Sequence, residues 1–142
     1  MKMDYKYLTP DEALAARGGR SSNVLLEGIM KEHLREANKI SYKGKEFYFT
    51  DTNINTAILA LRDLPIQDGY IQANIAFYDL ITLGKSLDQA VLGDKKGFTF
   101  QYIDWKKPEN NVYHVTEEYS VLRTNRTDTY RPDVVLFING IP

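Results

Sequence analysis

The sequence predicts an α/β fold, close to the border with the α+β class, in which helices flank a central mixed β-sheet. Up to Gly97 the apolar residues recur with helical spacing, and beyond Gly97 they alternate as in strands. The final apolar run, Val134–Ile138, is apolar on both faces, which is typical of a central strand covered on both sides. We expect a single domain over residues 1–142, with a leading segment at 1–20, a helical half at 21–97 and a sheet half at 98–142.

Two helices are expected near the N-terminus. Thr9 and Glu12 have the spacing of a capping box, with a proline between them at the first helical position. A short helix therefore begins there and ends at the glycines of "RGGR". A longer helix is expected over 22–37, capped by Ser21 or Ser22, because "SSNVLLEGIMKEHLREAN" carries an apolar stripe with helical spacing.

The next segments alternate between extended and helical patterns. "YKGKEFYF" is expected to form a short strand or one arm of a hairpin. A third helix follows in "TNINTAILALRDL", capped by Thr52 or Asn53. A fourth helix over 70–83 ends at Gly84, because glycine is favoured directly after a helix.

Three strands are expected in the sheet half, at 98–105, 114–123 and 132–138. After the last strand, Asn139-Gly140 is the dipeptide that most strongly predicts a two-residue hairpin turn. Such a turn needs a strand on its far side, so we expect a hairpin that is broken at the C-terminus. An apolar strand edge without its neighbour pairs with other chains. We therefore expect this chain to self-associate, or to cover that edge with its own N-terminal segment.

The composition is that of an ordinary globular domain, with 43% hydrophobic and 26% charged residues. No apolar run is long enough to span a bilayer, and the N-terminus lacks the apolar region of a secretory signal. The absence of cysteine excludes disulfides and thiolate zinc sites. A cytoplasmic protein is expected, without membrane contact. The sequence contains no P-loop, no nucleophile-elbow motif and no dinucleotide-binding fingerprint.

Asp133 is a candidate catalytic and metal-binding residue because it begins the most apolar strand. An ionised carboxylate at such a place is costly unless it is paired or binds a metal. Pro132, directly before it, removes a backbone donor, so strand pairing is expected to begin just after the proline. The alternative is a strand-end carboxylate that faces water or pairs with Arg131 or Arg123.

Glu27 is the second candidate, because it shares a helical face with Val24, Met30 and Leu34. A carboxylate therefore interrupts an apolar stripe. The alternative is that Glu27 lies at the rim of that stripe and extends its carboxylate into water.

Basic residues are slightly in excess in the sheet half, with seven basic and five acidic residues from Lys95 to Arg131. They could contact DNA phosphates, but a solvated face explains them equally well. The weak candidates for DNA contact are Lys106, Lys107, Arg123, Arg126 and Arg131.

Several segments together resemble the nuclease domain of the R (motor) subunit of type I restriction enzymes. They are "RPDVVLFINGIP", the "PENN" loop in "FQYIDWKKPENNVYHVTEEYSV", the early "SSNVLLEGIMKEHLREAN" and "ANIAFYDLITLG". The resemblance runs from about Ser21 onward with the segments in the same order. It implies a PD-(D/E)XK nuclease core, incomplete at the C-terminus, because the family's Glu-x-Lys strand follows the matched ending.

The resemblance implies a type I site-specific deoxyribonuclease, in which Asp133 matches the family's metal-binding aspartate. Glu27 lies where many nucleases of the superfamily place an accessory acid. The implied cofactor is Mg²⁺, which stabilises charge at the scissile phosphate and activates water. Because the Glu-x-Lys is not in this sequence, the 142-residue chain is expected to bind metal weakly and to be inactive by itself.

The resemblance also implies a longer parent protein. Such a protein carries ATP-using helicase domains, acts on unmodified foreign duplex DNA, and assembles with methyltransferase (M) and specificity (S) subunits. The alternative function is a non-catalytic scaffold of the same fold that docks DNA or partner subunits.

Overall fold

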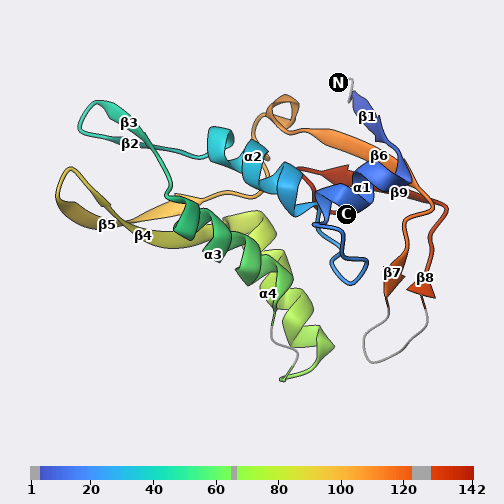
Figure 1. The fold of residues 1–142 in the computed structure, drawn as a ribbon. Coiled ribbons are helices and arrows are strands. Elements are labelled where there is room, and N and C mark those ends of the chain that lie inside the picture. Colours follow the sequence, from blue (N-terminus) through green and yellow to red (C-terminus); the bar gives the residue numbers. More distant parts are fainter. Residues whose placement is uncertain (1–3, 65–66, 123–128) are drawn as a thin grey trace. The chain divides into compact units, whose positions relative to one another are not determined.

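The computed structural model describes residues 4–64, 67–122 and 129–142. The chain divides into two compact units: Met1–Met30 together with Glu109–Pro142 form the first unit, and Lys31–Pro108 form the second. Each unit combines helices with small sheets, which is compatible with the α+β side of the predicted fold class (Figure 1). Within the described ranges, no helix is both long enough and apolar enough to cross a membrane.

A three-stranded mixed sheet is the centre of the first unit. It consists of β1 (Tyr5–Leu8), β6 (Tyr113–Glu117) and β9 (Val134–Ile138), in the order β1-β6-β9. β1 is parallel to β6, and β9 is antiparallel to it. A mixed sheet that contains the strands near 114 and 134 is therefore confirmed, although Tyr5–Leu8 was not predicted to join it.

The first helix of this unit, α1 (Pro10–Ala16), begins as the sequence predicts. The Thr9 Oγ1 atom accepts a hydrogen bond from the Glu12 N–H at 3.2 Å, and the Glu12 carboxylate accepts one from the Thr9 N–H at 3.0 Å. This reciprocal pair is the predicted capping box. Gly18 and Gly19 follow the helix with positive φ angles of 69° and 74°, a conformation that ends a helix readily.

The predicted second strand, 114–123, is interrupted. β6 ends at Glu117, Glu118 has a φ of 53°, and β7 (Val121–Leu122) resumes in a separate two-stranded sheet with β8 (Thr129–Tyr130). The left-handed residue redirects the chain, so the alternating pattern does not continue as one strand. The "KKPENN" loop contains a single 3-10 turn, η1 (Pro108–Asn110).

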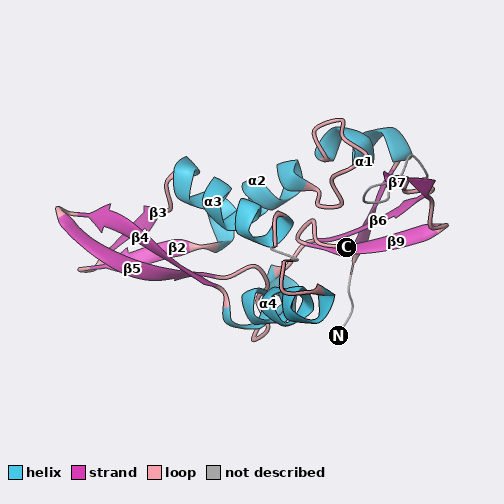
Figure 2. Cartoon of the chain, turned by 90° about the horizontal axis from the view of Figure 1, so that it is seen from below, coloured by secondary structure: helices cyan, strands magenta, loops and turns pink. Residues whose placement is uncertain are grey.

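The described part of the second unit contains two antiparallel hairpins, two complete helices and residues 31–37 of a third helix, α2 (Glu27–Ala37). The hairpins are β2 (Lys39–Tyr42) with β3 (Lys45–Tyr48), and β4 (Lys85–Val91) with β5 (Asp94–Phe100); the helices are α3 (Asp51–Arg62) and α4 (Tyr70–Leu83). Both hairpins and both helices are visible from below in Figure 2. The prediction of a short strand or hairpin arm at "YKGKEFYF" is confirmed, since β3 is one arm of the β2–β3 hairpin, and so is the predicted end of the fourth helix at Gly84.

The prediction that a strand at 98–105 joins the central sheet is wrong. β5 ends at Phe100 and pairs with β4, which the sequence analysis had not assigned as a strand. Phe100 and Tyr102 are fully buried in the second unit, and the Tyr102 hydroxyl donates to the Ala57 carbonyl at 2.6 Å. Burial raises the pKa of Tyr102. These aromatic residues therefore belong to the core of the second unit and not to the central sheet of the first.

Two predicted helix starts need correction. α2 (Glu27–Ala37) begins later than Ser22, because the Asn23 side chain accepts a hydrogen bond from the Leu25 N–H at 3.1 Å and holds that segment in a turn. The cap of α3 is Thr50 rather than Thr52 or Asn53, and its side chain accepts from the Asn53 N–H at 3.2 Å.

The predicted hairpin turn after β9 is confirmed. Asn139 and Gly140 have φ angles of 52° and 84°, which is the sign pattern of a type I′ turn. Ile138 and Ile141 exchange two backbone hydrogen bonds of 2.9 Å across it. The chain has therefore reversed direction and entered the path of a strand alongside β9 before the sequence ends.

β9 is not the doubly covered central strand that its apolar pattern predicts. Among the described residues it is an edge strand, paired along its length with β6 and on its other edge only through Ile141. Val134 and Leu136 are 62% and 52% exposed, whereas Phe137 is fully buried. The proposed cover by the N-terminal segment is also wrong, because β1 pairs with the opposite edge of β6.

The free edge of β9 leads us to expect self-association of the 142-residue chain, because unpaired N–H and C=O groups beside exposed apolar side chains favour pairing with a second copy. Leu136→Lys places a charge on this edge and is expected to reduce association. Sedimentation velocity at matched concentrations measures the effect. Val24→Lys, at an apolar residue of the same unit that is 39% exposed, is the control. Monomeric behaviour of both the unaltered chain and the variant would contradict the expectation.

Candidate functional site

Asp133 lies at the head of β9 and is exposed to solvent. Its backbone carbonyl accepts a hydrogen bond from the Glu118 N–H at 3.1 Å, which fixes the start of the strand against the end of β6. Arg131, one of the two partners considered for it, donates instead to the Glu118 carboxylate at 2.6 Å. The other, Arg123, lies outside the described residues. Exposure to solvent is therefore what the structure shows of the Asp133 side chain.

Two acidic residues that the sequence analysis passed over lie beside Asp133. The register of the sheet pairs Glu117 with Val134, and Glu118 follows directly. The Glu117 carboxylate accepts a hydrogen bond from the Tyr7 hydroxyl at 2.8 Å, which raises the pKa of Tyr7. The "TEEYS" segment carries both acids, but only knowledge of the strand register could have placed them at the head of β9.

Glu27, the second predicted site residue, is half-buried and forms the first residue of α2. The N–H of the preceding residue, Leu26, donates to the Gly140 carbonyl at 2.9 Å. Gly140 follows β9, whereas Asp133 precedes it, so the backbones of the two predicted acids are anchored at opposite ends of this strand. Because an extended strand rises about 3.3 Å per residue, the five residues of β9 separate these two anchor points along the strand. A shared role for Glu27 and Asp133 stays a prediction.

The donor set supports only part of a magnesium site. Within the described ranges, no group of three or more histidine, aspartate or glutamate side chains is arranged to hold a metal ion. Mg²⁺ commonly takes one or two carboxylates from a protein and completes its octahedron with water and phosphate oxygens. An exposed strand-end aspartate fits the place of one such carboxylate. The residues that the structure describes do not make a complete site.

The predicted DNA contacts are divided between the units. Lys106 and Lys107 are exposed in the second unit, and their backbone N–H groups both donate to the Asp104 carboxylate, at 3.1 and 2.9 Å. Arg131 belongs to the first unit, and Arg123 and Arg126 lie outside the described residues. These contacts stay a prediction.

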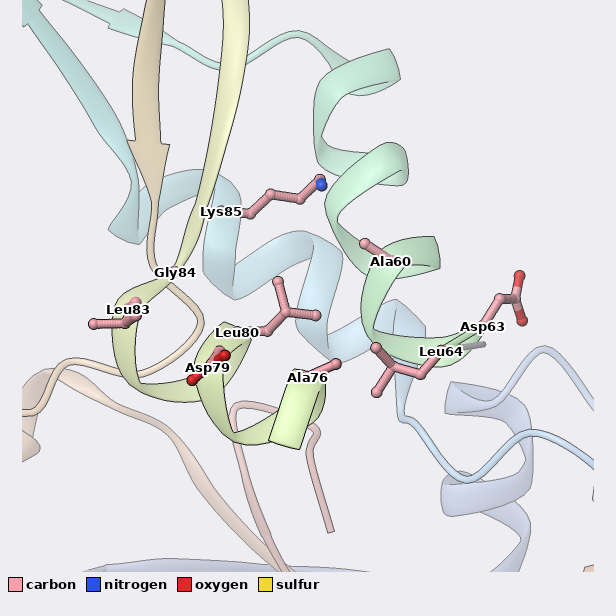
Figure 3. Close-up of a pocket in the computed structure, with 9 residues that line it drawn as sticks. All are labelled: Ala60, Asp63, Leu64, Ala76, Asp79, Leu80, Leu83, Gly84 and Lys85. Atoms are coloured by element: carbon pink, nitrogen blue, oxygen red, sulfur yellow. The ribbon is translucent and has the colours of Figure 1, made fainter. Parts of the chain in front are cut away.

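A pocket in the second unit lies between α3 and α4 and has a volume of about 460 Å³ (Figure 3). Leucine and alanine side chains line it, with Asp63, Asp79 and Lys85 as its charged residues. Asp63 is already paired with its neighbour Arg62 at 3.1 Å. None of the residues predicted to act in catalysis lines this pocket.

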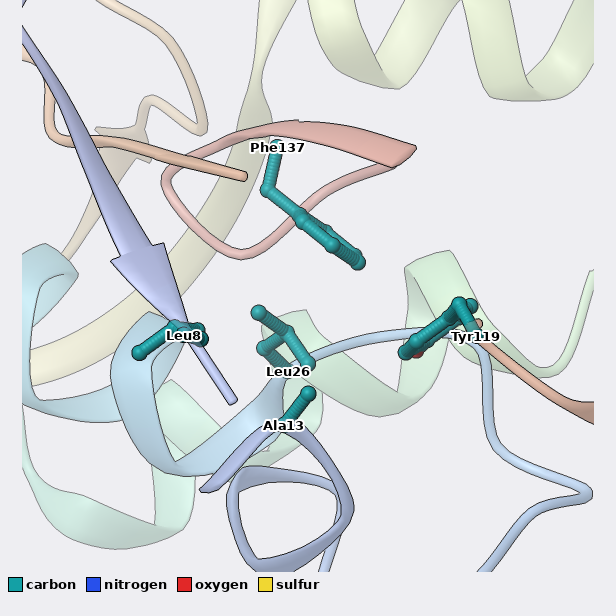
Figure 4. Close-up of a cluster of buried hydrophobic side chains, with 5 residues drawn as sticks. All are labelled: Leu8, Ala13, Leu26, Tyr119 and Phe137. Atoms are coloured by element: carbon teal, nitrogen blue, oxygen red, sulfur yellow. The ribbon is translucent and has the colours of Figure 1, made fainter. Parts of the chain in front are cut away.

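A buried apolar cluster of the first unit includes Phe137 of β9 and packs against that strand. Its members come from β1, α1, the segment before α2, the β6–β7 connection and β9: Leu8, Ala13, Leu26, Tyr119 and Phe137 (Figure 4). The Tyr119 and Phe137 rings pack edge to face with centroids 5.2 Å apart. This cluster packs β9, the strand that follows Asp133, against the segment that leads into α2.

Arg17 reinforces the same region from the end of α1. It is only 4% exposed, and its guanidinium lies 4.0 Å from the centre of the Tyr119 ring. It donates to the Ser120 carbonyl at 2.8 Å, and the Tyr119 hydroxyl donates to the Val24 carbonyl at 2.6 Å. Burial raises the pKa of Tyr119 to about 12. These contacts fix the connections at the ends of β6 and α1.

Comparison with known proteins gives a family and a relative. The whole chain, residues 1–142, matches the family described as the N terminus of the type I restriction enzyme R protein. It is 33% identical over 125 residues to a protein of Methanocaldococcus jannaschii whose name describes it as the endonuclease subunit of the type I restriction enzyme MjaVIIIP. The match covers 88% of this chain but only 11% of that relative. No solved structure matches the chain.

Proposed function

This chain belongs to the family of type I restriction enzyme R protein N termini, and on that premise we propose that it forms the DNA-cleaving part of an R subunit. The reaction is hydrolysis of phosphodiester bonds in unmodified duplex DNA. The relative named as an endonuclease subunit supports this function. The observation that carries it is the exposed Asp133 at the head of β9, followed by a turn that returns the chain alongside that strand.

The turn at Asn139-Gly140 directs the following chain back along β9, and this supports the proposal that the rest of the site comes from that segment. A chain that continues beyond Pro142 as a strand pairs with the free edge of β9, in the register that Ile138 and Ile141 already set. Such a strand reaches the level of Asp133 about four residues after Pro142. We propose that a carboxylate and a lysine on it complete a PD-(D/E)XK site with Asp133.

We propose that Asp133 supplies one ligand to Mg²⁺ in the completed site. The bound ion would stabilise negative charge on the scissile phosphate and lower the pKa of an attacking water. The described residues hold only part of the donor set, and the 142-residue chain is therefore expected to be inactive by itself. The β6–β9 pairing and the buried cluster beneath it keep Asp133 fixed at the head of its strand.

The wider context of the activity also follows as a proposal from the family. The match spans 11% of the length of the archaeal relative. We propose that the parent protein uses ATP in helicase domains beyond this chain. We further propose that it works in a complex with methyltransferase and specificity subunits on duplex DNA.

Metal binding tests the proposed site without relying on cleavage. In the full R subunit without ATP, Mn²⁺ used as a substitute for Mg²⁺ is expected to bind at this site, and electron paramagnetic resonance measures the bound fraction. Asp133→Asn is expected to remove that binding, because the ion loses a charged ligand. The 142-residue chain is expected to bind Mn²⁺ much more weakly. Unchanged binding by the variant would contradict the role of Asp133.

A non-catalytic docking scaffold is the second candidate, because the described residues contain no complete metal cluster. The residues that follow Pro142 in the parent protein separate the two functions. A strand with Glu-x-Lys supports the nuclease. A following segment with neither an acid nor a lysine at the level of Asp133 supports the scaffold.

A further inference from the structure

The two hairpins of the second unit end in tight turns that lie side by side (Figures 1 and 2). In the β2–β3 turn, Lys43 and Gly44 have φ angles of 49° and 77°, and in the β4–β5 turn, Leu92 and Gly93 have 51° and 82°. Both are two-residue turns with the sign pattern of type I′, which matches the twist of the flanking strands. The Tyr42 hydroxyl donates to the Asp94 carboxylate at 2.7 Å and joins the tips.

Positive charge is concentrated at these tips. Four exposed lysines lie in or beside the turns, and we call them with Tyr42 the hairpin-tip patch: Lys43, Lys45, Lys95 and Lys96. The net charge of the whole chain is −1, so this concentration is a local feature. The acidic residues at the tips are Glu46, which the register places opposite Ser41, and Asp94.

Asp94 is already engaged inside the patch. Its carboxylate accepts hydrogen bonds from the Tyr42 hydroxyl and from the Lys43 ammonium, the latter at 3.2 Å, and these contacts lower its pKa. The Asp94 carboxylate therefore connects the two tips, and the four lysines there outnumber the two acidic residues. The Tyr42 ring also packs edge to face with Phe98, with ring centroids 6.2 Å apart.

The lysines converge on one tyrosine. The ammonium groups of Lys43 and Lys96 lie 5.3 and 4.9 Å from the centre of the Tyr42 ring, although they belong to different hairpins. Lys45 pairs with Tyr42 in the β2–β3 register, which puts the two side chains on the same face. The aromatic ring holds cations close together that would otherwise repel each other. This arrangement suits a ligand with closely spaced negative charges.

We infer that the hairpin-tip patch binds the phosphate backbone of duplex DNA. Lysine ammonium groups pair with phosphates as point charges, and backbone contacts of this kind supply most sequence-independent affinity. Two-stranded ribbons are also narrow enough to enter the major groove. The inference rests on the proposed function, since it names a surface that holds the DNA substrate. It assigns this role to residues other than the predicted contacts Lys106 and Lys107.

The test compares DNA binding by charge-matched variants of the chain. A fluorescent 20-base-pair duplex of arbitrary sequence is titrated with the unaltered chain, with a variant carrying Lys43→Gln, Lys45→Gln and Lys96→Gln, and with a control. The control neutralises three exposed cations elsewhere, namely Lys6, Arg20 and Lys31. Anisotropy is measured from 50 to 300 mM NaCl, and circular dichroism checks that each variant is folded.

The tip variant is expected to bind DNA at least about tenfold more weakly. The slope of log K against log salt concentration should also become less steep by about two to three, because each phosphate contact contributes about 0.9. The control should keep most of the affinity and slope. Equal binding by the tip variant and the unaltered chain would overturn this inference but not the proposed function. No binding by the unaltered chain at 50 mM NaCl would also count against the proposed DNA substrate. Lost binding to an M or S subunit, with DNA binding unchanged, would show that the patch contacts protein.

Discussion

Replacing Asp133 by alanine in the full R subunit is expected to lower the rate of DNA cleavage at least about 100-fold and to leave ATP hydrolysis unchanged. A catalytic metal contributes several kcal/mol of charge stabilisation in the transition state, and each 1.36 kcal/mol corresponds to about tenfold in rate. The side chain is exposed at the head of an edge strand, so its removal creates no cavity and should not unfold the domain.

Cleavage of supercoiled plasmid and release of phosphate from ATP, measured in the same reaction, separate the two activities. Asp11→Ala removes an exposed carboxylate from α1 of the same unit and should leave both rates unchanged. Glu27→Gln and Glu117→Gln in the same assay decide which carboxylate assists Asp133. The prediction fails if the Asp133 variant cuts DNA at the rate of the unaltered enzyme.

Replacing Gly140 by alanine is expected to destabilise the chain by roughly 2–5 kcal/mol. A Cβ atom at this position would lie 2.6 Å from Met30 Cγ and 2.7 Å from the Leu26 carbonyl oxygen. The φ angle of 84° adds the strain of a left-handed conformation. Overpacking of a core costs typically 1–3 kcal/mol, and a left-handed alanine roughly 1–2 kcal/mol more.

Gly44→Ala provides a matched control for this substitution. Gly44 occupies the equivalent position of the β2–β3 turn, with a φ of 77°, but nothing lies within 4 Å of a Cβ placed there. This variant therefore carries the conformational strain without the clash, and its cost should be about 1–2 kcal/mol. Urea unfolding, followed by circular dichroism, measures both. Equal losses of stability would show that the packing of Gly140 against α2 is not tight.

Local signals were read correctly from the sequence where a few neighbouring residues determine the structure. Thr9 and Glu12 form the predicted capping box, and Asn139-Gly140 forms the predicted turn. Each of these depends on hydrogen bonds or backbone angles within four residues. The predicted start of α2 was wrong because Asn23 caps a turn with its own side chain, an alternative that an apolar stripe does not reveal.

Strand pairing could not be read in the same way. The aromatic alternation at 98–105 indicated a strand but not its partner, and β5 pairs with β4 in the second unit. The apolar run of β9 indicated a central strand, although Val134 and Leu136 are exposed in this chain. Asp133 was predicted as a site residue from its motif, and that role stays a prediction, whereas the position of Glu117 and Glu118 beside it depends on a register that joins distant parts of the sequence.

The parallel pairing of β1 with β6 also determines the order in which the chain can fold during synthesis. Tyr5 pairs with Tyr113, so the first unit depends on contacts between residues more than 100 positions apart. All of Lys31–Pro108, which forms the second unit, is made between these two strands. Ribosomes complete N-terminal segments first, and contacts of long sequence separation form slowly. The second unit can therefore fold before β6 and β9 are synthesised, at a time when β1 and α1 still lack these two partners.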